Sequence, residues 1–198
     1  MNVKAWSYDL FIEPLVAGLK RGVADRIHAG ALVIDIACGP GSMAMSMAAR
    51  ARHVTGIDLD MDLIRYATER AGKYKIDNIS FIVHDAADLS GFSDSQFDIA
   101  VTSMAIHQFS EELAVQLLGE MKRISSKVII ADYNYPMPHG LSRTVAYSIE
   151  RMAGGDHYRN FLNYMSRGGL KWFTDSAALF IKSTSVRSSG VFLIAECE

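Results

Sequence analysis

The sequence lacks the features that mark disulfide-rich, membrane-spanning or nucleic-acid-binding proteins. Its 198 residues include two cysteines, Cys38 and Cys197, which lie far apart and fit neither a disulfide framework nor a zinc-binding spacing. The net charge of −2 gives no positive excess to bind a phosphate backbone. No apolar run is long enough to span a bilayer. We therefore expect a cytoplasmic protein with no membrane span, with no DNA partner and with RNA disfavoured as a substrate.

The length of the chain predicts one domain over residues 1–198. Residues 1–10 contain no unbroken apolar run and so predict no signal peptide. Residues 1–29 are expected to form a helical cap, with a break at Pro14, because apolar side chains recur there at every fourth position. These side chains are Phe11, Leu15, Leu19, Val23 and Ile27.

Short apolar runs alternate with helical patterns through the first two thirds of the chain. The predicted strands are Ala31–Cys38, His53–Ile57, Ile79–Val83, Asp98–Met104 and Lys127–Ala131. The predicted helices between them are Ser42–Arg52, Asp60–Lys73 and Ser110–Ile124. Strict alternation of strand and helix predicts an α/β fold with a parallel sheet.

The last third is less regular. Two helices are predicted, over Leu141–Met152 and Tyr158–Met165. Near the end, Ser183–Arg187 and Val191–Glu196 flank a turn made of two serines and Gly190, which predicts a hairpin and hence one antiparallel strand at the edge of the sheet.

Unusual residues follow the predicted strands, at the edge of a parallel sheet where ligands bind. Gly39 and Gly41 allow a close backbone approach in the first loop. Asp35 lies inside an apolar strand, where burial requires a partner such as an ammonium group. Asp58 ends the second strand, where it can accept hydrogen bonds from ribose hydroxyls, and Asp85 follows the third, where it can accept an adenine amino hydrogen.

These segments resemble the class I S-adenosylmethionine-dependent methyltransferases. VIDIACGPGS is similar to the glycine-rich motif of that family, and GIDLD, HDAADL and FDIAVTSMAIHQF resemble its next three motifs in order. YRNFLNYMSRGGL resembles the quinone-biosynthesis C-methyltransferase group. One departure is that Ala37 stands where the family has its first motif glycine.

The resemblance implies a Rossmann-like sandwich with a mostly parallel seven-stranded sheet and a C-terminal antiparallel hairpin strand. It also implies S-adenosylmethionine as the cofactor and S-adenosylhomocysteine as the product. The implied cofactor-binding residues are Tyr8, Asp35, Ala37, Cys38, Gly39, Gly41, Asp58, Leu59, Asp85, Ala86 and Thr102. Thr102 would line the site near the sulfonium, and Tyr8 would cover the cofactor.

Two alternatives remain open at this point. Residues 39–44 also satisfy the G-x-G-x-x-A pattern of NAD(P)-binding oxidoreductases, although Asp35 and Asp85 have no role there. A non-catalytic partner subunit that binds S-adenosylmethionine is the second alternative.

The predicted activity is methyl transfer to a small apolar or aromatic molecule, because the variable segment 133–173 is rich in aromatic side chains. The candidate catalytic residues are His107, Tyr133 and His157, with Asp132 positioned to orient one of them. No histidine or cysteine cluster has metal-ligand spacing, so no metal is expected. The sequence leaves open the methylated atom, the use of a general base, and a homodimeric state.

Overall fold

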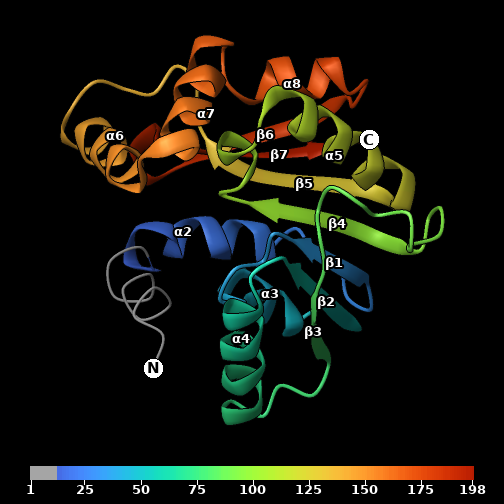
Figure 1. Cartoon of the computed structure of the whole chain (residues 1–198). Coiled ribbons are helices and arrows are strands. Elements are labelled where there is room, and N and C mark those ends of the chain that lie inside the picture. The colour runs from blue at the N-terminus through green and yellow to red at the C-terminus, as the bar shows by residue number, and fades with distance from the viewer. Residues whose placement is uncertain (1–12) are drawn as a thin grey trace.

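The computed structural model describes residues 13–198, and its centre is one seven-stranded sheet (Figure 1). The strand order is β3-β2-β1-β4-β5-β7-β6, which confirms the predicted Rossmann-like methyltransferase topology. The strands are β1 (Leu32–Ile36), β2 (His53–Asp58), β3 (Ile79–Val83), β4 (Phe97–Ser103), β5 (Ser125–Tyr133), β6 (Ile181–Arg187) and β7 (Phe192–Cys197).

The predicted C-terminal hairpin is present, but the prediction of an antiparallel edge strand was wrong in one detail. The antiparallel strand β7 lies inside the sheet, between β5 and β6. The edge strand β6 is antiparallel to β7 and hence runs in the same direction as β5. The reason is hydrophobic burial, since β7 carries Ile194 and Ala195 with no exposed surface whereas β6 is largely exposed.

The central strands form because their side chains are apolar on both faces of the sheet. Ile34 and Ile36 of β1 are fully buried, as is Ile99 of β4. Full burial of an isoleucine side chain stabilises the fold by about 1.5–3 kcal/mol. Asp35, the exception in β1, is also fully buried. Burying its carboxyl group destabilises the fold unless a partner group binds it, so a functional role is indicated.

Within residues 13–198, the helices pack on the sheet and on one another. The helices are α2 (Glu13–Ala24), α3 (Ser42–Ala48), α4 (Met61–Lys73), α5 (Glu111–Ile124), α6 (Leu141–Ala153), α7 (Gly155–Ser166) and α8 (Leu170–Ser176). Helices α2 and α3 pack against each other and α3 contacts β2, whereas α5 packs on α8, β4 and β5. Helix α7 contacts the short 3₁₀ helix η1 (Ile106–Gln108) that follows β4.

One helix was missed by the sequence pattern. It is α8, a helix of seven residues after the two-glycine bend at 168–169. Helix α3 begins at Ser42 as predicted, with Gly41 as its capping residue at a φ of 76°. Asp60 caps α4, because its side chain accepts hydrogen bonds from the amides of Asp62 and Leu63.

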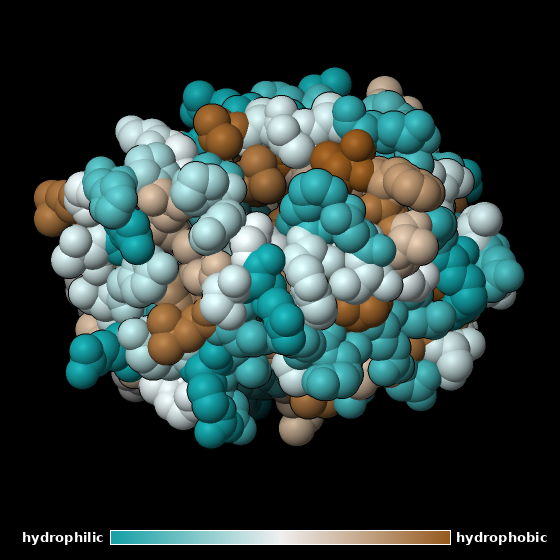
Figure 2. Space-filling view, turned by 90° about the horizontal axis from the view of Figure 1, so that it is seen from above, coloured by the Kyte–Doolittle hydropathy of each residue, from teal (hydrophilic) through white to brown (hydrophobic). Residues whose placement is uncertain are grey.

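The face seen from above in Figure 2 carries hydrophobic side chains in separate small patches among polar ones. Over the described residues, exposed large side chains include Leu141, Met152 and Phe180. No helix within 13–198 combines the length and the apolar character needed to cross a membrane.

Candidate functional site

The loop between β1 and α3 forms one wall of a cavity of about 980 Å³ at the carboxyl ends of the strands. Ala37, Gly39 and Gly41 all have positive φ angles, so the chain turns sharply into the helix. A Cβ added at Gly41 would lie 2.6 Å from the Phe81 ring, whereas one at Gly39 would meet nothing within 4 Å. Gly41 is therefore required for packing, and Gly39 leaves the backbone open to a ligand.

Asp35 lies in the strand before this loop, is fully buried and, like Gly41, is not among the residues that line the cavity. Neither of its carboxylate oxygens accepts a hydrogen bond of ordinary geometry. Burial, helped by the charge of Asp58, raises the pKa of Asp35 to about 8, and the Ala44 amide offsets only part of this rise. A buried carboxylate without a partner is matched to a cationic ligand group.

Asp58 ties the first two loops together. One of its oxygens accepts a hydrogen bond from the Gly39 amide at 2.8 Å, and the other accepts from the Asp60 amide at 3.0 Å. Asp58 and the adjacent Leu59, whose side chain is largely exposed, both line the cavity. The carboxylate is thus held at the cavity wall by backbone groups, in a position to accept further hydrogen bonds.

The loop after β3 supplies the next part of the wall, through His84, Asp85 and Ala86. Asp85 accepts a hydrogen bond from the Ala87 amide at 2.9 Å, which folds the loop on itself. Asp85 and Ala86 thus both line the cavity, and their contact with adenine stays a prediction.

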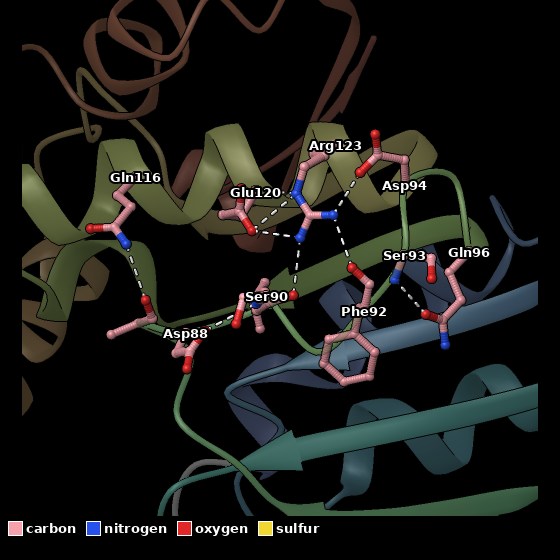
Figure 3. A network of polar contacts seen from close by, with 11 residues as sticks. Asp88, Ser90, Phe92, Ser93, Asp94, Gln96, Gln116, Glu120 and Arg123 are labelled. Carbon is pink, nitrogen blue, oxygen red and sulfur yellow. Dashed lines mark hydrogen bonds and ion pairs between the residues drawn. The ribbon is translucent and has the colours of Figure 1, made fainter.

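Arg123 on α5 fixes the continuation of this loop (Figure 3). Its guanidinium donates to the carbonyl oxygens of Leu89 at 3.0 Å and Phe92 at 2.9 Å. The same group pairs with Asp94 and Glu120, both at 2.7 Å. The loop after β3 is therefore anchored to α5.

Thr102 does not line the cavity, contrary to the prediction. It is fully buried and its hydroxyl donates to the Ile36 carbonyl at 3.0 Å, so it holds the end of β4 to the end of β1. The cavity wall at this point is made by the next two residues, Ser103 and Met104. The alternation of side chains along a strand explains the difference of one position.

Beyond β4, His107 is buried against Asp132 at the end of β5. The His107 Nδ1 lies 2.5 Å from an Asp132 oxygen, and the His107 amide donates to the other oxygen at 3.2 Å. Burial alone would lower the pKa of His107, but the charges of Asp132 and Glu150 outweigh it and raise this pKa to about 9. The prediction that Asp132 orients a candidate catalytic residue agrees with this contact.

Glu150 of α6 joins the three candidate catalytic residues. Its Oε1 accepts a hydrogen bond from the Tyr133 hydroxyl at 2.7 Å and lies 3.5 Å from His107 Nε2. Its Oε2 lies 2.5 Å from His157 Nε2. Although burial would raise the pKa of Glu150, these contacts lower it to about 2. The acceptor cluster, defined as His107, Tyr133, Glu150 and His157, thus forms one connected unit on the cavity wall.

Sequence reasoning missed Glu150, although a signal for it exists. Helix α6 faces the cavity with a stripe of small and apolar side chains, and Glu150 is the charged member of that stripe. The residues of the stripe are Leu141, Ser142, Val145, Ala146, Ile149, Glu150 and Ala153. An acid on an otherwise apolar helix face requires a buried partner, and this is the pattern that would have identified it.

The predicted N-terminal cap and the predicted variable segment 133–173 differ in what they contribute to the cavity. Tyr8 lies outside the described residues. In the remainder of the predicted cap, over residues 17–29, no side chain lines the cavity. The segment 133–173 does contribute to the cavity, through Tyr133, His157 and the α6 stripe.

Comparison with known proteins agrees with this geometry. Residues 33–127 match a family described as a methyltransferase domain. The demethylmenaquinone methyltransferase of Thermobifida fusca is 23% identical over 72% of this chain and 63% of its own length. A ubiquinone biosynthesis O-methyltransferase of Xanthomonas oryzae pv. oryzae is 28% identical over 68% of this chain and 57% of its own length. The chain thus spans less than two thirds of either relative.

A solved structure shows the same fold over nearly the whole chain. It is an S-adenosylmethionine-dependent methyltransferase from Aquifex aeolicus, with a TM-score of 0.70 and 17% identity, covering 98% of this chain and 96% of its own. The matched family does not support the oxidoreductase alternative. The matched domain over residues 33–127, the sheet order and these similarities give this chain the fold of the class I S-adenosylmethionine-dependent methyltransferases, a family whose cofactor is S-adenosylmethionine.

Proposed function

We propose that this chain transfers a methyl group from S-adenosylmethionine to a small aromatic molecule that carries an ionisable hydroxyl. The observation that carries the proposal is one continuous cavity, which is lined at one end by Asp58 and Gly39 and at the other by the acceptor cluster. A cavity of about 980 Å³ is at the upper end of the range for small-molecule sites.

The residues of the first three loops fit the cofactor. The unpartnered carboxylate of Asp35 matches the ammonium of the methionine portion, and the open backbone at Gly39 leaves room for it. Asp58 is held with its carboxylate at the wall, as a ribose requires. Asp85 and Ala86 are placed to contact the adenine edge. The cofactor supplies a methyl group already activated on a positively charged sulfur.

The opposite wall fits an aromatic acceptor. Its apolar part comes from Val145 and Ile149 of α6 together with Phe192 of β7. Its polar part is the acceptor cluster, which binds the ionisable group of the acceptor and favours its deprotonated form. The two relatives are named for demethylmenaquinone and for ubiquinone biosynthesis, which supports an aromatic acceptor of the quinone type.

The experiment is a turnover assay of the purified chain with S-adenosylmethionine labelled on the methyl group. The acceptor panel contains hydroquinones and catechols, their ring analogues without a hydroxyl, and short RNA as a comparison. The proposal expects labelled product from the hydroxylated aromatics alone. Binding of S-adenosylmethionine without turnover on any acceptor would favour the non-catalytic partner subunit, and labelled RNA would contradict the small-molecule assignment.

A further inference from the structure

The acceptor cluster contains three metal-ligand side chains that are remote in sequence. His107 of η1, Glu150 of α6 and His157 of α7 place ligand atoms within 4.8 Å of one another. All three line the cavity. His107 and Glu150 are buried, and the His157 side chain is 30% exposed. The fold thus assembles a set that spacing along the sequence does not reveal.

The contacts of His107 direct its second ring nitrogen, Nε2, towards Glu150. Nδ1 is engaged by Asp132 at 2.5 Å, so a neutral ring carries its lone pair on Nε2. Nε2 is buried, makes no hydrogen bond and lies 3.5 Å from Glu150 Oε1. Nε2 and Glu150 Oε1 therefore need a positive charge between them, which either a proton on Nε2 or a bound metal ion that displaces this proton supplies.

We propose that His107, Glu150 and His157 bind one divalent transition-metal ion of the zinc type. Two imidazole nitrogens and one carboxylate are a donor set of catalytic zinc sites, in which a further coordination position stays open. Mg²⁺ prefers oxygen ligands and is disfavoured by the two histidines. The open position faces the cavity, because all three ligands belong to its wall.

The surrounding contacts match those of a metal centre. A histidine ligand is ordinarily oriented by a carboxylate on its other nitrogen, and Asp132 occupies that place for His107. The Tyr133 hydroxyl orients the Glu150 carboxylate in the same way, by donating to Oε1 at 2.7 Å. Asp132 and Tyr133 are therefore positioning residues for the ion.

The role of the ion rests on the proposed function. A hydroxyl oxygen bound at the open position becomes more acidic, and its proton leaves to solvent while the oxygen remains on the ion. The ion would thereby select acceptors with an ionisable hydroxyl and hold that oxygen inside the cavity. His107 then acts as a ligand and takes no proton from the acceptor.

The test uses the full chain, stripped with a chelator and titrated with Zn²⁺, with Mg²⁺ and with Co²⁺ as a spectroscopic probe. Calorimetry should find one Zn²⁺ per chain and no heat for Mg²⁺, and Co²⁺ should develop the intense visible absorption of a four- or five-coordinate site. His157→Gln should abolish the Co²⁺ spectrum. Asp132→Asn should weaken Zn²⁺ binding by about 10–100-fold. His28→Gln, a change at an exposed histidine outside the cavity, should alter neither.

Each variant is first checked for native circular dichroism and for S-adenosylhomocysteine binding, which involves the other end of the cavity. Retained S-adenosylhomocysteine binding with no Zn²⁺ bound to the wild type would overturn the metal site while leaving the proposed function intact. Zn²⁺ binding that His157→Gln does not change would overturn the ligand assignment. Loss of methyl transfer in a chain that still binds one Zn²⁺ would count against the proposed function alone.

Discussion

The two ends of the cavity are built by different means. The cofactor end, over residues 35–86, consists of loops that directly follow β1, β2 and β3, and it offers backbone amides, glycines and acids held by local hydrogen bonds. The acceptor end brings together η1, β5, α6 and α7, and it offers charged side chains that are already paired with one another. At the cofactor end, the Asp35 carboxyl group makes no hydrogen bond of ordinary geometry. At the acceptor end, the charged side chains are paired with one another.

This difference indicates how the two ends can vary. A site made of strand ends and backbone is fixed by the fold, because parallel strands deliver their carboxyl ends to one edge. A site made of side chains from separate helices changes with single substitutions. The cofactor end is therefore expected to be general, and the acceptor end to decide what is methylated.

The largest expected effect is a loss of turnover, without a loss of cofactor affinity, from a substitution in the acceptor cluster. His107→Gln removes the pairing with Asp132 and the ring nitrogen that lies 3.5 Å from Glu150 Oε1. Turnover should fall by about 10²–10⁴-fold, as for the loss of a group that stabilises the deprotonated acceptor. S-adenosylhomocysteine affinity, measured by calorimetry, should stay within a few-fold of the wild type. An equal loss of cofactor affinity would mean that the two ends do not act independently.

The reciprocal change is Asp58→Ala at the cofactor end. It removes the acceptor of the Gly39 and Asp60 amides as well as the group that is expected to bind the ribose. Loss of hydrogen bonds to a charged group should weaken S-adenosylmethionine binding by roughly 100-fold. Asp62→Ala, on the exposed surface of α4, serves as the control and should bind normally. Unchanged affinity in Asp58→Ala would remove Asp58 from the site.

Asp35 provides a pH-dependent test of the unpartnered carboxylate. Its pKa is raised from 3.8 to about 8 in the folded chain, so the folded state holds a proton that the unfolded state releases. The stability of the wild type should therefore fall as pH rises between these two values and level off above pH 8. Asp35→Asn lacks this loss, and its advantage over the wild type should grow by roughly 2 kcal/mol from pH 6 to pH 8.

Urea unfolding at several pH values measures this difference, with Asp77→Asn on the surface as the matched control. Saturation with S-adenosylmethionine should reduce the pH slope of the wild type, since an ammonium beside Asp35 favours the ionised form. If the free energy of unfolding varied with pH in the same way in the wild type and in Asp35→Asn, the Asp35 carboxylate would already have a partner in the folded chain.

The smallest expected effect concerns the anchor on the far side of the cofactor end. Arg123→Ala releases the carbonyls of Leu89 and Phe92 and leaves the loop after β3 held to α5 by the Gln116 bond to the Ala87 carbonyl. Hydrogen exchange should become faster over residues 88–94 and stay unchanged in β1 and β4. Cofactor affinity should fall only slightly, because Asp85 keeps its bond to the Ala87 amide. Unchanged hydrogen exchange over residues 88–94 would show that Arg123 does not anchor this loop.

The position of the cofactor end was largely predictable from the sequence, because its residues lie within, at the end of, or just after strands that the apolar pattern identifies. Thr102 was assigned wrongly by one position, since alternation along β4 turns it towards Ile36 and leaves Ser103 at the wall. The acceptor end was predicted only as separate candidates. Glu150 is marked in the sequence as an acid on an apolar helix face, but its contacts with Tyr133 and His157 depend on the packing of α6 and α7, which no spacing in the sequence encodes.

The most direct test of a single site with two ends is a crystal structure of the chain with S-adenosylhomocysteine. We expect the ribose on Asp58, the amino group within reach of Asp35, and the sulfur facing the acceptor cluster across the cavity. S-adenosylhomocysteine bound outside the cavity, or inside it with the sulfur turned away from His107 and Glu150, would contradict the proposed arrangement.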